Sequence, residues 1–265
     1  MTAAQHRKNL AGHLRDTTHR WHLWDVYRDF LELAALSVAN ALLPDEAREQ
    51  RYLACIARYT PDEAARFPKM LAELVMGLEA EPHDMLGMLF GELEQGNSAM
   101  GQFFTPFEVC RLMADLTVDG EMLDRINQRG FVTVQEPAVG AGAMIIAMAT
   151  ALSAKGVNYQ QCMHVTAIDT DLRAVHMAYL QFSLLGIPAT VVHGNTLTLE
   201  QHSVWHTPAH HLGLWGPKLR RGYLLGSPAD DDSTPPVTHD PVVLPGAQAA
   251  QGDLFSLLGT GVPHG

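Results

Sequence analysis

The spacing of apolar residues divides the chain into three parts. Up to about residue 118, apolar positions recur at helical intervals, as in "KMLAELVMGL", and Pro44 and Pro61 mark helix boundaries. From residue 131 to about residue 197 the pattern changes to short β-branched runs, "FVTVQ", "HVTAI" and "ATVVH", separated by two helical stretches that each end at a glycine. Beyond about residue 226 the chain is rich in proline, glycine and aspartate, which predicts disorder.

Strands that alternate with helices indicate βαβ crossovers and a parallel sheet. We therefore predict an α/β protein with a helical domain over residues 1–100, a truncated Rossmann-like core over residues 101–225 and a disordered tail over residues 226–265. The core is expected to be truncated, because too little chain follows it to build the later strands of a doubly wound sheet.

Composition narrows the function classes. The 265 residues are 47% hydrophobic, enough for a buried core, and their formal net charge is -11. This charge disfavours direct binding to nucleic acid, which depends on neutralising phosphates. The three cysteines (Cys55, Cys110 and Cys162) form no CxxC pair and fit a reducing cytosol. Because no leader-like or membrane-spanning run is found, we expect a soluble, cytoplasmic protein.

The turn after the first predicted strand is the first candidate site. In "EPAVGAGAMI", Gly140 and Gly142 lie between a strand and a helix, where glycine lets the backbone approach a ligand closely. Ile145 stands where the dinucleotide fingerprint has its third glycine, and no Gly-Lys-Ser/Thr follows, so phosphate binding is disfavoured. A tight turn without a ligand is the alternative interpretation.

The next two strands also end in polar residues. Asp169 closes "HVTAID", where an acidic side chain can accept hydrogen bonds from the ribose hydroxyls of a nucleoside. Asn195 in "HGNTL" follows the third strand, within reach of an adenine edge. Helix capping is the alternative explanation for such an acid, and Asp171 is the residue placed for that role.

A further motif, "GQFFTPFEV", precedes the strands. Thr105, Pro106 and Glu108 have the spacing of a capping box with proline at the first helical position. That role does not account for Phe103 and Phe104 directly before the cap, which could pack around a ligand.

Together, these stretches resemble the adenine-N6 DNA methyltransferases, specifically the modification subunits of type I restriction systems, over roughly residues 20–200. The resemblance implies S-adenosylmethionine (SAM) as the cofactor, with Thr105 near its methionine carboxylate and Asp169 on its ribose. Asn195 in "GNTL" replaces the aspartate of the family's "GDTL". The implied cofactor-binding residues are Gln102, Phe103, Phe104, Thr105, Pro106, Glu136, Gly140, Ala141, Gly142, Asp169 and Asn195.

The catalytic motif of this family is missing. Methyl transfer to the adenine amine uses [ND]-P-P-[YF] after the fourth strand, and the sequence offers only Ser227 and Pro228 in "GSPAD" and the "TPPV" of residues 234–237. Neither matches, so the catalytic residues are unknown. Two functions remain open: a DNA adenine methyltransferase that a partner subunit completes and brings to DNA, or a non-enzymatic accessory or decoy of a restriction-modification or replication assembly.

Two groups of residues before the tail have weaker interpretations. His206 and His210 are four apart, as on a metal-binding helix face, but no cysteine or carboxylate pair completes a tetrahedral site, so no metal is expected. Lys218, Arg220 and Arg221 could contact phosphate, although a solvated helix end is the more ordinary interpretation.

The tail contains one more motif. In "QGDLFSLLG", the residues Gln251, Asp253, Leu254 and Phe255 resemble the peptide by which bacterial polymerases and repair proteins dock on the sliding clamp. The alternative is a short amphipathic turn that packs back on the protein.

Overall fold

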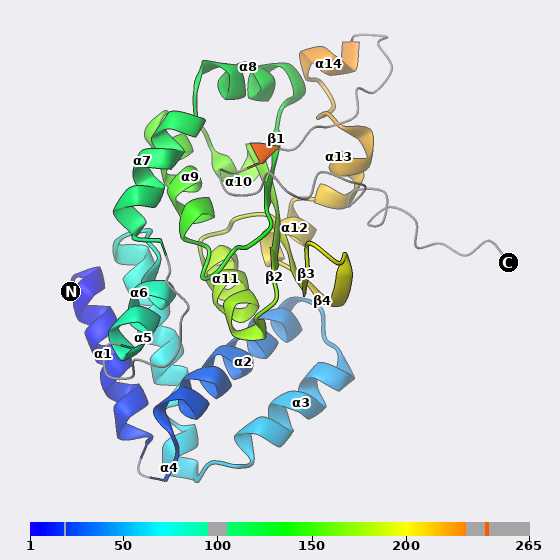
Figure 1. Ribbon diagram of the computed structural model, residues 1–265. Coiled ribbons are helices and arrows are strands. Elements are labelled where there is room, and N and C mark those ends of the chain that lie inside the picture. Colours follow the sequence, from blue (N-terminus) through cyan, green and yellow to red (C-terminus); the bar gives the residue numbers. More distant parts are fainter. Residues whose placement is uncertain (19, 95–104, 232–241, 244–265) are drawn as a thin grey trace, which may run out of the picture.

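The computed structural model describes residues 1–18, 20–94, 105–231 and 242–243 (Figure 1). In its N-terminal part the helices are α1 (Ala3–Asp16), α2 (Leu23–Leu42), α3 (Glu46–Ile56), α4 (Pro61–Ala64), α5 (Phe67–Ala80) and α6 (Met85–Glu94). None of the helices in these ranges combines the length and the apolar character that a membrane crossing requires.

Helices and strands alternate in the second part, as the pattern predicted. Its elements are α7 (Phe107–Thr117), α8 (Gly120–Arg129), β1 (Val132–Glu136), α9 (Ala143–Ala154), α10 (Tyr159–Cys162), β2 (Met163–Asp169), α11 (Leu172–Leu184), β3 (Ala189–Asn195), β4 (Glu200–His206), α12 (Pro208–Leu212), α13 (Trp215–Arg221), α14 (Pro228–Asp231) and β5 (Val242–Val243).

Local sequence explains several of the element boundaries. Thr60 and Glu63 form a complete capping box at the start of α4, whose first residue is Pro61. Gly156 and Gly186, which follow α9 and α11, have φ angles of 76° and 68°. Glycine adopts this left-handed conformation without the steric cost that other residues meet, which is why both helices end there.

The sheet has the strand order β4-β3-β2-β1-β5. β1 pairs with β2 and β2 pairs with β3 in parallel, so the predicted βαβ crossovers are confirmed. β4 runs antiparallel to β3 at one edge. The carboxyl ends of β1, β2 and β3 therefore lie along the same edge of the sheet, where ligands of open α/β folds bind.

Alternate residues of the strands face two different layers. Val165 and Ala167 belong to the main apolar core, whereas Ile168 and Val192 form a small second cluster. Figure 1 shows α9 and α11 on one side of the sheet and α12 and α13 on the other. Both faces are thus covered, which explains the nearly continuous burial of β2.

The apolar core continues from the helical part into the sheet part. Tyr27 on α2 is fully buried, and its hydroxyl contacts the sulfur of Met177 on α11. Figure 1 shows α2 running alongside α11. The buried residues of both parts form one contiguous cluster, so the core shows no break near residue 100. The division of the chain into two domains at that point stays a prediction.

Two short elements lie in the segment that the sequence predicted to be disordered from residue 226. Residues 228–231 form α14, and Val242 and Val243 pair with β1 as the edge strand β5. Val242 and Val243 form a strand because β1 offers them backbone hydrogen bonds, which composition does not reveal. The remainder of that segment lies outside the described residues.

Candidate functional site

The three polar strand ends predicted from the sequence meet at one edge of the sheet. Glu136 closes β1, Asp169 closes β2 and Asn195 closes β3. The parallel register pairs Glu136 with Ala167 and Asp169 with His193, so the three ends are adjacent. The structure therefore brings together the candidate residues that follow the strands.

Asp169 holds two backbone segments at this edge. Its Oδ2 accepts a hydrogen bond from the Gly140 N–H at 2.8 Å, and its Oδ1 accepts one from the Asp171 N–H at 2.9 Å. Asp171 in turn caps α11 by accepting from the Arg173 N–H, so the capping role proposed for it is confirmed. Asp169 is half-buried and a carboxylate has about four lone-pair sites, so it can accept further hydrogen bonds from a ligand.

The glycine turn needs both of its glycines. Gly140 and Gly142 have φ angles of 54° and 100°, in the left-handed region that other residues rarely adopt. A Cβ on Gly142 would lie 2.6 Å from the ring of Phe182 on α11. The turn is therefore pressed against the helix that follows β2, which places its backbone beside Asp169.

Glu136 carries the second carboxylate of the site. Burial raises its pKa, the Ala138 N–H that donates to Oε1 at 3.1 Å opposes this, and the negative charge of Asp169 raises the pKa further. Two carboxylates are thus concentrated at the ends of β1 and β2. A cationic ligand with hydroxyl groups would relieve their repulsion.

Asn195 has a local role at the end of β3. Its Oδ1 accepts hydrogen bonds from the N–H groups of Leu197 and Thr198, at 2.9 and 3.3 Å. The neighbouring Thr196 donates to the carbonyl of Pro137 at 2.8 Å and so joins the ends of β3 and β1. Contact of Asn195 with an adenine ring stays a prediction.

The upstream motif is described only in part. Gln102, Phe103 and Phe104 lie outside the described residues, whereas Thr105 and Pro106 are exposed directly before α7. The predicted capping box was wrong: Pro106 is the N-cap of α7 without a side-chain hydrogen bond, and Glu108 forms an ion pair with Arg111 at 3.8 Å instead.

This donor set fits SAM. Asp169 would offer acceptor capacity to the ribose hydroxyls, and Glu136 and Asp169 would offer negative charge to the sulfonium and amino groups. Gly140 and Gly142 remove side chains from the turn where a ligand would approach. Ala141, also expected among the contacts, is 1% exposed, and its carbonyl accepts a hydrogen bond from Gln181, so its contact with a ligand stays a prediction.

Sequence reasoning missed two buried polar residues beside the turn, Asp84 before α6 and Gln181 on α11. Gln181 donates hydrogen bonds to the Ala141 carbonyl and to Asp84 Oδ1, both at 2.8 Å. A glutamine inside the apolar stretch "HMAYLQFSLL" was the available signal, because a polar side chain in a buried helix requires partners.

His206 and His210 do not share a helix face, because His206 ends β4 and His210 belongs to α12. The prediction of helical spacing was wrong, yet their rings stack with centroids 4.4 Å apart. His164 Nε2 lies 2.8 Å from His210 Nδ1, and burial lowers the pKa of His210 to about 4. These rings lie near the start of β2 and β3, at the edge of the sheet opposite the glycine turn.

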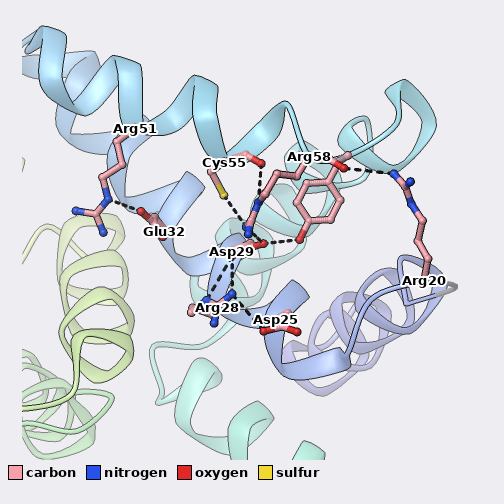
Figure 2. Close-up of polar contacts among 9 residues, drawn as sticks. Arg20, Asp25, Arg28, Asp29, Glu32, Arg51, Cys55 and Arg58 are labelled. Carbon is pink, nitrogen blue, oxygen red and sulfur yellow. Dashed lines mark hydrogen bonds and ion pairs between the residues drawn. The ribbon is translucent and has the colours of Figure 1, made fainter.

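A group of metal-ligand-type side chains occurs elsewhere, formed by Asp29, Glu32 and Cys55. Figure 2 shows that arginines already neutralise it: Arg58 binds Asp29, and Arg51 binds Glu32. Asp29 is 2% exposed and also accepts from the Tyr59 hydroxyl at 2.6 Å. A cation would have to displace these guanidinium groups, so we interpret the cluster as a structural link between α2 and α3.

The remaining candidates lie away from the glycine turn or outside the residues that the structure describes. Ser227 is buried directly before α14, which begins at Pro228 and packs on α8. Lys218 lies over the ring of Trp215 at 4.6 Å, at the end of a short helix that also holds Arg220 and Arg221. The peptide with Gln251, Asp253, Leu254 and Phe255 and the "TPPV" of residues 234–237 lie outside the described residues.

Several solved structures match this chain, and two of them are described as methyltransferases. One is described as a class I S-adenosylmethionine-dependent methyltransferase from Listeria monocytogenes, with 16% identity, a TM-score of 0.38, and coverage of 71% of this chain and 53% of that one. The other is a type I restriction-modification system methyltransferase subunit from Streptococcus thermophilus, with 16% identity, a TM-score of 0.41, and coverage of 74% and 58%. This chain thus spans little more than half the length of either.

The family comparison is more specific. No curated protein matches the chain. The family model described as N-6 DNA Methylase matches residues 84–212, just under half of the chain. The matched segment begins at Asp84 and contains the glycine turn, Asp169 and Asn195, which confirms the resemblance drawn from the motifs and supports SAM as the cofactor. Residues 84–212 of the chain are therefore similar to the N-6 DNA methylase family.

Proposed function

We propose that the chain binds SAM at the ends of β1 and β2 and serves an adenine-N6 DNA methylation system as a subunit that is catalytically incomplete by itself. The observation that carries the proposal is the Asp169 carboxylate, which holds the glycine turn through Gly140 and keeps acceptor capacity for a ribose. When bound, SAM supplies an electrophilic methyl group. The role of this chain is to hold that cofactor in a fixed orientation.

The residues of the site have separate roles in this proposal. Asp169 accepts from the ribose hydroxyls, and Glu136 adds negative charge near the cationic end of the ligand. Thr105, exposed before α7, would donate to the methionine carboxylate. Gly140 and Gly142 keep the turn free of side chains, so that its backbone can approach the ligand.

The incomplete part is the handling of the target base. Adenine must leave the DNA stack, and its amine must meet acceptors that aim the nitrogen at the methyl group. The sequence contains no [ND]-P-P-[YF], and its closest substitute, Ser227 with Pro228, packs beside α8. A partner subunit would have to supply base recognition, and with a net charge of -11 it would also supply most contacts to DNA phosphates.

The first test is cofactor binding. Wild-type protein should bind SAM or S-adenosylhomocysteine in a calorimetric titration, and Asp169→Ala should weaken binding by about 1.5 to 3 kcal/mol, the range for hydrogen bonds to a charged group. Asp119→Ala is the matched control, because Asp119 also accepts a backbone hydrogen bond, from the Met122 N–H at 2.9 Å, but at α8. Absence of heat and of a thermal shift at millimolar cofactor in the wild type would refute the site.

The second test is methyl transfer. Highly purified protein should transfer no labelled methyl group from SAM to unmethylated DNA of mixed sequence, while an active adenine methyltransferase does so in the same reaction mixture. Incorporation should appear only when host extract supplies a partner. Robust transfer by the pure chain, abolished by Asp169→Ala, would contradict incompleteness and redirect attention to Ser227 and Pro228.

The non-enzymatic alternative, an accessory or decoy of a modification subunit, is favoured by the same missing tetrapeptide. It predicts cofactor binding without methyl transfer under any of these conditions. The extract experiment therefore separates the two functions.

A further inference from the structure

A buried polar connection joins the helical part of the chain to the glycine turn. Gln181 on α11 is 0% exposed, and all of its polar atoms have partners. Its Nε2 donates to the Ala141 carbonyl and to Asp84 Oδ1, both at 2.8 Å, and its Oε1 accepts from the Leu86 N–H at 3.1 Å. Only one orientation of the amide satisfies these three partners, so the side chain is fixed.

Asp84 is held as firmly as Gln181. It is 3% exposed, and its Oδ1 also accepts from the Gly87 N–H at 2.9 Å, within the first turn of α6. Gly87 leaves room for this carboxylate, because a Cβ there would lie 2.1 Å from Asp84 Oδ2. The hydroxyl of Tyr27 on α2 donates to the neighbouring Leu86 carbonyl at 3.0 Å. The backbone at the start of α6 is therefore fixed from two sides.

At the end opposite Asp84, the connection reaches the centre of the glycine turn. Ala141 lies between the two glycines with positive φ, and its carbonyl is buried where water cannot replace a lost donor. Asp169 holds the preceding Gly140 by its N–H. Two side chains thus hydrogen-bond to successive residues of the turn. Asp169, at the end of β2, accepts from Gly140, and Gln181, within α11, donates to Ala141.

We infer that Gln181, oriented by Asp84, is a positioning residue for the cofactor: it holds the Ala141 carbonyl so that the turn has its binding geometry before the ligand arrives. This inference deepens the proposed function and rests on it for the identity of the ligand. It makes the helical segment before α7 part of the cofactor site, although its side chains need not touch the cofactor.

The central variant is Gln181→Met, which keeps the length of the side chain and removes its hydrogen bonds. We expect SAM affinity to fall about tenfold or more, as the loss of one buried hydrogen bond implies. We also expect faster hydrogen exchange in the peptide that spans residues 136–146, where the Gly140 and Gly142 amides are bonded to Asp169 and Val139. Asp84→Ala removes the acceptor that orients Gln181 and should lower SAM affinity in the same direction.

Thr207→Val is the matched control for a purely structural effect. Thr207 is 0% exposed, accepts from the Ala189 N–H and donates to the Ile187 carbonyl, but it lies at the other edge of the sheet. It should lower the unfolding midpoint to a similar extent while leaving SAM affinity and exchange at residues 136–146 unchanged. If Gln181→Met does not fold, Gln181→Asn, which is one methylene shorter, replaces it.

The outcomes distinguish the two proposals. Wild-type affinity and exchange in the Gln181 variant, or equal losses in Thr207→Val, would overturn the positioning role. If the wild type binds no SAM, the proposed function fails, and the exchange measurement still decides whether Gln181 holds the turn.

Discussion

Replacement of Gly142 by alanine should destabilise the protein by about 2 to 5 kcal/mol and weaken SAM binding at least tenfold. An alanine at a φ of 100° incurs about 1 to 2 kcal/mol of backbone strain. Its Cβ would also lie 2.6 Å from the ring of Phe182, which is fully buried and cannot withdraw without disturbing the core; such overpacking typically costs about 1 to 3 kcal/mol. Urea unfolding and calorimetric titration with SAM measure the two effects.

Gly156→Ala isolates the backbone term. Gly156 also has a positive φ, 76°, but among the described residues no atom lies within 4 Å of an added Cβ. This variant should lose only the backbone strain of about 1 to 2 kcal/mol and bind SAM like the wild type. If the two variants lose the same free energy of unfolding, the close contact of the turn with Phe182 on α11 adds nothing to the destabilisation of Gly142→Ala.

Mild acid should lower the stability between pH 7 and pH 5 through two buried histidines, His164 and His176, of which His176 accounts for about 2 kcal/mol. They are 1% and 2% exposed. Burial, together with the nearby rings of His210 and His206, lowers the pKa of His164 well below 6.5, and burial, with Arg51 nearby, lowers that of His176 to about 3.

Stability falls with pH because the unfolded chain binds protons that the folded chain does not. Below pH 6.5 the unfolded chain protonates both rings while the folded chain keeps them neutral, so stability is complete above pH 6.5 and falls as the pH falls. At pH 5 the neutral His176 ring costs about 2 kcal/mol, at about 1.36 kcal/mol per pH unit, and His164 adds a loss of the same sign. This is a large fraction of the roughly 5 to 15 kcal/mol of a typical domain.

His176→Phe tests this contribution. The ring of His176 packs edge-on against Trp205 at 5.0 Å, and its Nε2 has no hydrogen-bond partner in the described part of the chain, so phenylalanine can keep the packing. The stability lost between pH 7 and pH 5, measured by urea unfolding, should shrink by about 2 kcal/mol. His202→Gln, at an exposed position, should leave that loss as it is in the wild type. An unchanged loss in His176→Phe would show that His176 is not kept neutral by burial.

The sequence was sufficient where a short stretch carries its own physical constraint. A change of apolar period marks β1, β2 and β3, and a strand followed by two glycines needs a turn with positive φ, so Gly140 and Gly142 could be recognised. Asp169 followed from the same logic, since the carboxyl end of a parallel strand faces the ligand edge.

Local patterns failed where a competing interaction lay elsewhere in the chain. Glu108 has capping-box spacing, yet it pairs with Arg111. His206 has helical spacing from His210, yet its segment pairs with β3 as an antiparallel strand. Val242 and Val243 were assigned to the tail, because sequence composition does not show that β1 has an open edge.

By itself, the sequence determined the α/β order of elements, the glycine turn and the acid after β2, because each is encoded within a few residues. Only the tertiary structure decided what holds that turn. Asp84 and Gln181 are 97 positions apart, and their contact exists because α6 and α11 pack together. A buried amide and carboxylate satisfy each other only when both elements are in place, so their role cannot be read from either segment alone.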